Sequence, residues 1–274
     1  MYNCARLMDA YRTHPLGDDS PMIFDLQKAS ILKRISAALL DLILLCILAV
    51  GLGSGVSSVI GYDRHYQVLS DTYAQYEAEY GVTFSISPEE YEALSPEEAT
   101  AYDEAYAALV ADEDAISAYN MVLSQSLVVV SLGILLAYLV LEFAVPLVLG
   151  NGQTVGKKVF SLALMRTDGV QLQPFALFVR TVLGKYTVET MIPVLIVMMI
   201  FWGTIGILGP AILFVLGVAQ LVLVIANHHN ALIHDLLACT VVVDFSSQMI
   251  FRTSEDLLAY KQRIHAEQAA KKKY

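Results

Sequence analysis

Four ionisable residues in or beside the long apolar runs of this sequence could do chemistry. Asp41 and Glu142 each lie inside such a run, Arg34 lies at the edge of the run that contains Asp41, and Asp235 lies just beyond the last run. A charge at bilayer depth is costly unless it is paired, hydrated or protonated. These residues therefore indicate either a salt-bridged clasp that fixes helix packing or a protonatable pathway for a cation.

The spacing of Arg34 and Asp41 predicts that neither is the other's partner. Seven residues place them on one helix face, about two turns or ~10 Å apart. Each is expected to pair with another helix or loop instead. Ala37 and Ala38 between them permit the close approach of a neighbouring segment.

The elements that position these charges are four predicted transmembrane helices. Of 274 residues, 56% are hydrophobic and 16% charged, and the apolar ones cluster in runs long enough to cross a ~30 Å hydrocarbon core. We predict spans at 31–60, 121–149, 186–202 and 210–226. Three glycines and Pro210 interrupt the last run and favour two spans, with one long tilted helix as the alternative.

The distribution of lysine and arginine predicts the orientation, because these residues prefer the cytoplasmic side. Between the first two spans, segment 61–120 has one basic residue, Arg64, against 14 acids, and is predicted to lie outside. The cytoplasmic parts are then the N-terminal segment 1–30, a loop at 150–185, a His-Asp segment with a strand at 227–245 and a helical tail at 246–274.

Segment 61–120 is predicted to form an external acidic cap of two or three amphipathic helices. Tyrosines recur there at helical steps, and Ser-Pro-Glu-Glu occurs at 87–90 and again at 95–98, each with a Ser N-cap and Pro in the first turn. The cap is either a solvated acidic face over a tyrosine-rich seam or a docking surface for a protein partner.

The cytoplasmic segments predict a small β element and exclude a nucleotide site. Gly150–Lys158 resembles a phosphate loop, but Asn151 replaces the required glycine and Lys158 the required Ser or Thr. Asp168-Gly169, after the apolar stretch 159–166, suggests a short hairpin, and 240–245 is predicted to be a β-branched strand that pairs with these loop segments in a small sheet. The predicted fold class is therefore an all-α membrane protein with an external helical cap and this β element.

Other chemistry finds little support in the sequence. His228, His229 and His234 lack a zinc-ligand spacing, and the three cysteines are expected to be free thiols. No catalytic triad or paired-carboxylate arrangement is legible. We expect no enzyme activity, no metal, no cofactor and no nucleic-acid partner.

Three motifs together resemble the RDD family of membrane proteins, which is named for one Arg and two Asp. They are Lys33–Asp41, Gly152–Lys158 followed by Asp168-Gly169 and Arg180, and His234–Val242. The family charges match Arg34, Asp41 and Asp235, with Cys239 where members more often carry Gly. The supporting residues that this resemblance and the apolar runs together indicate are Glu142, Arg180, His234, Gly152, Thr154, Gly156 and Lys157.

The resemblance implies a multi-pass membrane protein with the lipid bilayer as its surroundings, and the lysine and arginine distribution predicts that both termini lie in the cytoplasm of a cell-membrane protein. Its function is left between a scaffold or accessory subunit organised by a buried Arg/Asp clasp and a transporter of a small ligand or a cation/proton exchanger. Four spans without an inverted repeat count against a transporter, although a homo-oligomer could supply a pore.

Overall fold

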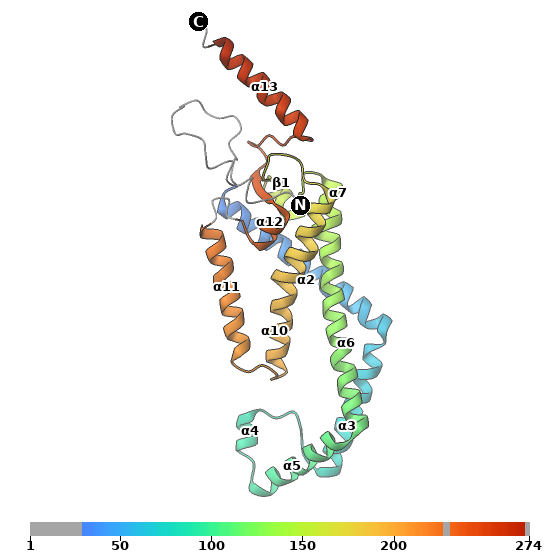
Figure 1. The fold of residues 1–274 in the computed structure, drawn as a ribbon. Helices are drawn as coiled ribbons and strands as arrows, with labels where there is room; N and C mark the ends of the chain where they lie inside the picture. Colours follow the sequence, from blue (N-terminus) through green and yellow to red (C-terminus); the bar gives the residue numbers. More distant parts are fainter. Residues whose placement is uncertain (1–28, 227–230, 272–274) are drawn as a thin grey trace. The chain divides into compact units, whose positions relative to one another are not determined.

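A computed structural model describes residues 29–226 and 231–271 of the chain (Figure 1). Within these residues, four helical segments are long and apolar enough to cross a membrane: Ile31–Ile60, Glu113–Leu149, Pro174–Phe201 and Leu208–Ala226. The predicted fold class is confirmed, because a two-stranded sheet accompanies these spans. His228, His229 and nearly all of the predicted segment 1–30 lie outside the described residues.

The first and last spans are single helices, α2 (Ile31–Ile60) and α11 (Leu208–Ala226). The other two change their helical type along their length. The second runs through α6 (Glu113–Tyr138), the π-helix η1 (Leu139–Ala144) and α7 (Val145–Leu149), and the third through α9 (Pro174–Phe178), the π-helix η2 (Val179–Met191) and α10 (Ile192–Phe201).

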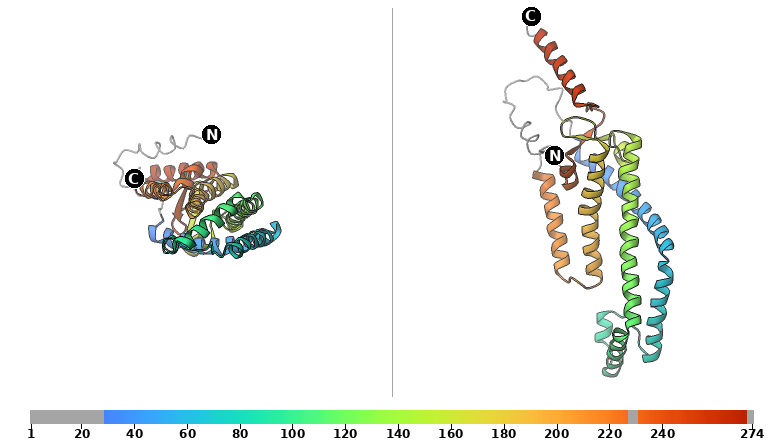
Figure 2. Two further views of the ribbon diagram at one scale, coloured as in Figure 1. Left: turned by 90° about the horizontal axis from the view of Figure 1, so that it is seen from below. Right: turned by 45° about the vertical axis from the view of Figure 1, so that its right-hand side comes forward.

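The third helix begins at Pro174, twelve residues before the predicted start at Tyr186. Proline suits the first turn of a helix because its missing N–H would be unpaired there anyway. Arg180 and Lys185, which fall in the predicted loop 150–185, therefore lie inside the helix. A glycine-containing turn then separates α10 from α11, which run side by side in Figures 1 and 2, so the alternative of one long tilted helix is wrong.

The chain divides into two compact units, one of residues 1–47 with 135–274 and the other of residues 48–134. The second unit contains α3 (Tyr62–Tyr80), α4 (Pro88–Glu92) and α5 (Pro96–Ala111). Both tandem motifs form capping boxes, in which Ser87 and Ser95 each accept a hydrogen bond from the backbone three residues on. Segment 61–120 therefore contains three helices before the second span, within the two or three expected from its sequence.

The tyrosines of this unit pack against one another and against Phe84. The ring of Phe84 meets Tyr73 and Tyr102 edge-on, and Tyr102 meets Tyr91 in the same way. The Tyr76 hydroxyl donates to Asp112 Oδ2 at 2.8 Å. Edge-to-face pairs of this kind stabilise packing, so these tyrosines form a seam between α3, the following loop and α5.

In the first unit, strands β1 (Leu162–Arg166) and β2 (Thr240–Asp244) pair antiparallel, as predicted from their β-branched and apolar residues. Thr167–Gly169 form the tight turn expected from Asp-Gly, with the Arg166 amide donating to the Val170 carbonyl. The core beside the sheet includes Ala37, Leu162 and Val242. The short helices α8 (Val155–Val159) and α12 (Ile233–Ala238) flank the strands, and α13 (Ser254–Lys271) follows them.

Cys239 ends α12 in the left-handed conformation, with φ at 52°. Glycine is favoured at such a position because it has no Cβ, which explains why family members more often carry Gly there. The expectation that all cysteines are free thiols is wrong for Cys239, which is disulfide-bonded, and holds for Cys46. Sequence separation gave no guide here, since pairing depends on distance in space.

Helices α2 and α6 approach closely within residues 48–134. A Cβ added to Gly133 would lie 2.9 Å from the Gly53 Cα and 3.0 Å from the Ala49 carbonyl oxygen. Small residues allow such backbone contact between apolar helices, where van der Waals packing holds the helices together.

We expect Gly133→Ala to destabilise the protein by about 1–3 kcal/mol, because the added methyl group overpacks this crossing. Gly55→Ala is the matched control, since a Cβ added there would have no neighbour within 4 Å and alanine is the better helix former. Thermal unfolding in detergent micelles, followed by circular dichroism, measures both. Equal melting temperatures for the two variants would contradict the close contact.

Candidate functional site

The two π-helical segments carry four charged residues of the site, of which Glu142 and Arg180 are buried and Lys185 and Glu189 half-buried. Glu142 lies in η1, and Arg180, Lys185 and Glu189 lie in η2. In a π-helix each backbone N–H bonds to the carbonyl five residues back, and such segments are frequently found at functional sites. The wider turn of the π-helix brings Arg180 and Lys185 to one side of the helix. On an α-helix, the two residues would be about 140° apart around the helix axis.

Asp235 of α12 is the centre of a buried ion-pair cluster, the clasp, with Arg34 and Arg180. It accepts hydrogen bonds from Arg180 Nε at 3.1 Å and Nη2 at 2.8 Å, and from Thr240 Oγ1 at 3.1 Å. Arg34 Nη2 lies 3.7 Å from its other oxygen. Burial opposes ionisation of this carboxyl, but the coulombic attraction of Arg180 holds its pKa well below the usual value.

His234, the neighbour of Asp235, is paired with Glu189 of η2. Glu189 accepts from the His234 backbone N–H at 3.0 Å and lies 2.6 Å from its Nδ1. Burial is the main cause that lowers the pKa of His234, and the positive charge of nearby Arg180 lowers it further. The contact requires Gly184, because a Cβ there would lie 2.5 Å from the His234 Cβ.

Asp41 is not part of the clasp, contrary to the hypothesis that it joins Arg34, Asp235 and Arg180. Its carboxylate accepts from Thr154 Oγ1 at 2.5 Å and from the Gly156 backbone N–H at 2.7 Å. These donors belong to the first turn of α8, where the helix dipole favours an anion. Asp41 thereby fastens the first span to the loop after the second.

The glycines and the threonine of the supporting set explain how that loop can approach α2. A Cβ on Gly156 would clash with the Ala37 carbonyl oxygen, and Thr154 caps α8 by accepting from the Lys157 amide. Gly152 has φ at 61°, and a Cβ there would lie 2.7 Å from Leu164. These residues position Asp41 and Lys157.

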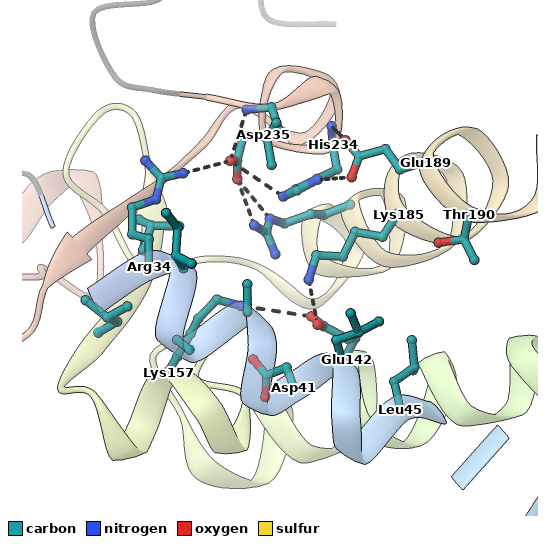
Figure 3. Close-up of a pocket in the computed structure, with 18 of the residues that line it drawn as sticks. Arg34, Asp41, Leu45, Glu142, Lys157, Lys185, Glu189, Thr190, His234 and Asp235 are labelled. Carbon is teal, nitrogen blue, oxygen red and sulfur yellow. Dashed lines mark hydrogen bonds and ion pairs between the residues drawn. The ribbon is translucent and has the colours of Figure 1, made fainter. Parts of the chain in front are cut away.

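Glu142 lies between two lysines and is bonded to one of them (Figure 3). Lys185 Nζ donates to Glu142 Oε1 at 2.5 Å, whereas Lys157 Nζ is 3.9 Å from Oε2. Both Lys157 Nζ and Glu142 Oε2 are buried without a hydrogen-bond partner among the described residues. Burial lowers the pKa of Lys157 to about 7, against the opposing attraction of Glu142.

A cavity of about 480 Å³ brings these groups together (Figure 3). Seven of the predicted residues line it, while Gly152, Thr154 and Gly156 lie behind it and position the loop. The lining members of the predicted set are Arg34, Asp41, Glu142, Lys157, Arg180, His234 and Asp235.

Three residues of the site were missed as site residues by sequence reasoning: Lys185, Glu189 and Gly184. On an α-helix, Glu189 and Arg180 would lie about 180° apart, on opposite faces, so an α-helical pattern does not predict that both line one cavity. The signal that was available is the recurrence of Arg180, Lys185 and Glu189 at five- and four-residue steps, which matches a π-helix. No group of three or more His, Cys, Asp or Glu able to hold a metal occurs in the part of the chain that is described.

A family model described as the RDD family matches residues 28–239. Comparison with curated proteins and with solved structures gave no match. The matched residues include all those that line the cavity except Val242.

We expect Asp235→Asn to destabilise the protein by about 3–5 kcal/mol, because the buried guanidinium group of Arg180 and the half-buried one of Arg34 lose their shared carboxylate. Glu267→Gln breaks the exposed 3.1 Å pair with Arg263 and serves as the control, with a change of at most ~1 kcal/mol. Unfolding of both variants by denaturing detergent measures the difference. Equal unfolding midpoints for Asp235→Asn and Glu267→Gln would show that the clasp does not stabilise the protein.

Proposed function

This chain belongs to the RDD family of membrane proteins, and on that premise we propose that it binds and moves a small charged solute through the cavity between its spans. The clasp of Arg34, Asp235 and Arg180 holds the walls of the cavity. The observation that carries the proposal is the buried pair Lys157 Nζ and Glu142 Oε2, which face each other at 3.9 Å without hydrogen bonds.

A purely structural network gives no reason for such a pair. Buried polar groups in native proteins are nearly always bonded, and each exception requires an explanation such as a bound water, an ion or a functional role. The clasp obeys this rule, since Asp235 accepts four hydrogen bonds, from two Arg180 nitrogens, the Thr240 hydroxyl and the Leu232 backbone N–H. The contrast between the two clusters favours a solute site at Lys157 and Glu142 over a clasp alone.

The rival function is a scaffold or accessory subunit that uses the acidic helices of segment 61–120 to bind a protein partner. Its support is the exposure of Tyr66 and Tyr106, at 54% and 55%, on an acidic surface. A homo-oligomer is compatible with either function. The cavity has no role in the scaffold, so an assay of the cavity separates the two.

We expect proteoliposomes on a solid-supported membrane to give a current after a jump of at least one charged solute among protons, sodium, potassium, phosphate and hexanoate. A transient current reports binding, and a sustained one reports transport. Lys157→Met abolishes the current because it removes the unbonded ammonium group. Glu142→Gln, which removes the charge of the other member of the pair, is expected to reduce it as well.

Lys158→Met is the matched control, since Lys158 is exposed and adjacent. Folding of each variant is checked by its melting temperature. The absence of current for all five solutes would leave the scaffold as the function.

The orientation that we propose places both termini in the cytoplasm of a cell-membrane protein and segment 61–120 outside. The support is the single basic residue against 14 acids in that segment.

In a cysteine-free background, we expect a membrane-impermeant maleimide to label Glu97→Cys in intact cells and to label Glu267→Cys only after lysis. Both positions are glutamates of exposed helical surface, so they are matched in accessibility. The reverse labelling pattern would invert the topology.

A further inference from the structure

We propose that the solute is an amphipathic oxyanion, a phosphate or carboxylate group on a short apolar tail, and that Lys157 binds its charged end. This inference rests on the proposed function and specifies the substrate class of that cavity. The experiment below can fail while the current described above persists, so the two proposals are tested separately.

The hydrogen-bonding capacity of the cavity calls for acceptors. Lys157 is 7% exposed, and its three N–H donors have no acceptor among the described residues. The one unbonded carboxylate oxygen nearby, Glu142 Oε2, is 3.9 Å away, beyond hydrogen-bonding distance. A bound group must therefore bring several lone pairs to Lys157, which is what an oxyanion offers.

The charges around Lys157 point the same way. Glu142 is the carboxylate shared by Lys157 and Lys185, and neither lysine has an ion pair with a second acid among the described residues. Asp41, the next acid, directs its oxygens to Thr154 and Gly156 instead. An anion beside Lys157 gives its ammonium group a partner that it does not share with Lys185.

A bare cation fits this cavity poorly. Cations such as sodium, magnesium or calcium are held by several oxygen ligands at once. Of the lining acids, Asp41, Asp235 and Glu189 already accept hydrogen bonds from protein donors. One free carboxylate oxygen, on Glu142, remains within the described residues.

Most of the uncharged cavity wall is aliphatic and favours a tail. Ile31, Ile35 and Leu42 of α2 line it and are themselves 51–55% exposed on a predicted span. Val224 and Leu232 contribute further apolar surface. A volume of about 480 Å³ is within the ~300–1,000 Å³ typical of small-ligand sites, so a polar head and a short chain fit together.

The test is isothermal titration calorimetry on the purified full chain in neutral detergent, with four probes. Hexyl phosphate and hexanoate carry both head and tail, inorganic phosphate carries the head alone, and hexyltrimethylammonium carries the tail with the opposite charge. We expect the two amphipathic anions to bind and Lys157→Met to weaken them about 10- to 100-fold, the loss typical of a hydrogen bond to a charged group. Lys158→Met retains the native affinity.

A proton count separates a binding role of Lys157 from a structural one. The charged groups facing Lys157 are Glu142 of η1, Lys185 and Arg180 of η2 and Asp41 of α2. At pH 8 hexanoate is fully ionised, and Lys157, with a pKa of about 7, is largely neutral. Binding of the anion favours the ammonium form, so protons are taken up when hexanoate binds, as measured from the heats in two buffers of different ionisation enthalpy. The Lys157→Met variant takes up none.

Each other outcome rejects part or all of the inference. Equal affinity for inorganic phosphate and hexyl phosphate removes the tail and makes the ligand a soluble anion. Binding of hexyltrimethylammonium as tight as that of hexyl phosphate, or unchanged affinity in Lys157→Met, overturns the oxyanion. Failure of all anions to bind, with a cation-dependent current intact, overturns this inference and leaves the proposed function standing.

Discussion

The first unit of this protein depends on one buried carboxylate being held between two guanidinium groups. Asp235 is 1% exposed, and an ionised carboxylate at such a place costs several kcal/mol unless it is paired and hydrogen-bonded. Its partners come from separate parts of the chain: Arg34 from α2, Arg180 from η2 and Thr240 from β2. Satisfying a single side chain therefore fixes a first span, a third span and the sheet relative to one another.

The π-helical segments follow from the same constraint. Arg180 must reach Asp235 while Lys185, five residues on, reaches Glu142, and the wider π turn allows both from one face. The Thr181 hydroxyl donates to the Glu142 carbonyl oxygen and so joins η2 to η1. The helices change their type at the level of the cavity, and the regular α-helical parts continue on either side.

The spans and the sheet could be predicted because they obey one-dimensional rules. The length of each apolar run matches the thickness of the bilayer, and the β-branched residues of segment 240–244 favour a strand. The start of the third helix could not, since Arg180 and Lys185 look like loop charges until their buried acids are known. The partner of Asp41 was also out of reach, because a backbone N–H at Gly156 carries no sequence signal and becomes a ligand through the position of α8.

The two charge clusters differ in how easily they can rearrange, and this difference locates function. Moving Asp235 breaks several charged hydrogen bonds in a low-dielectric interior, where an unpaired group is most costly. Moving the ammonium of Lys157 breaks none within the described residues, and its 3.9 Å contact with Glu142 leaves room for a polar group of another molecule. Rigid, satisfied charges beside a loosely held pair are what a binding site requires: fixed walls, and a group whose full hydrogen bonding is reached with the ligand in place.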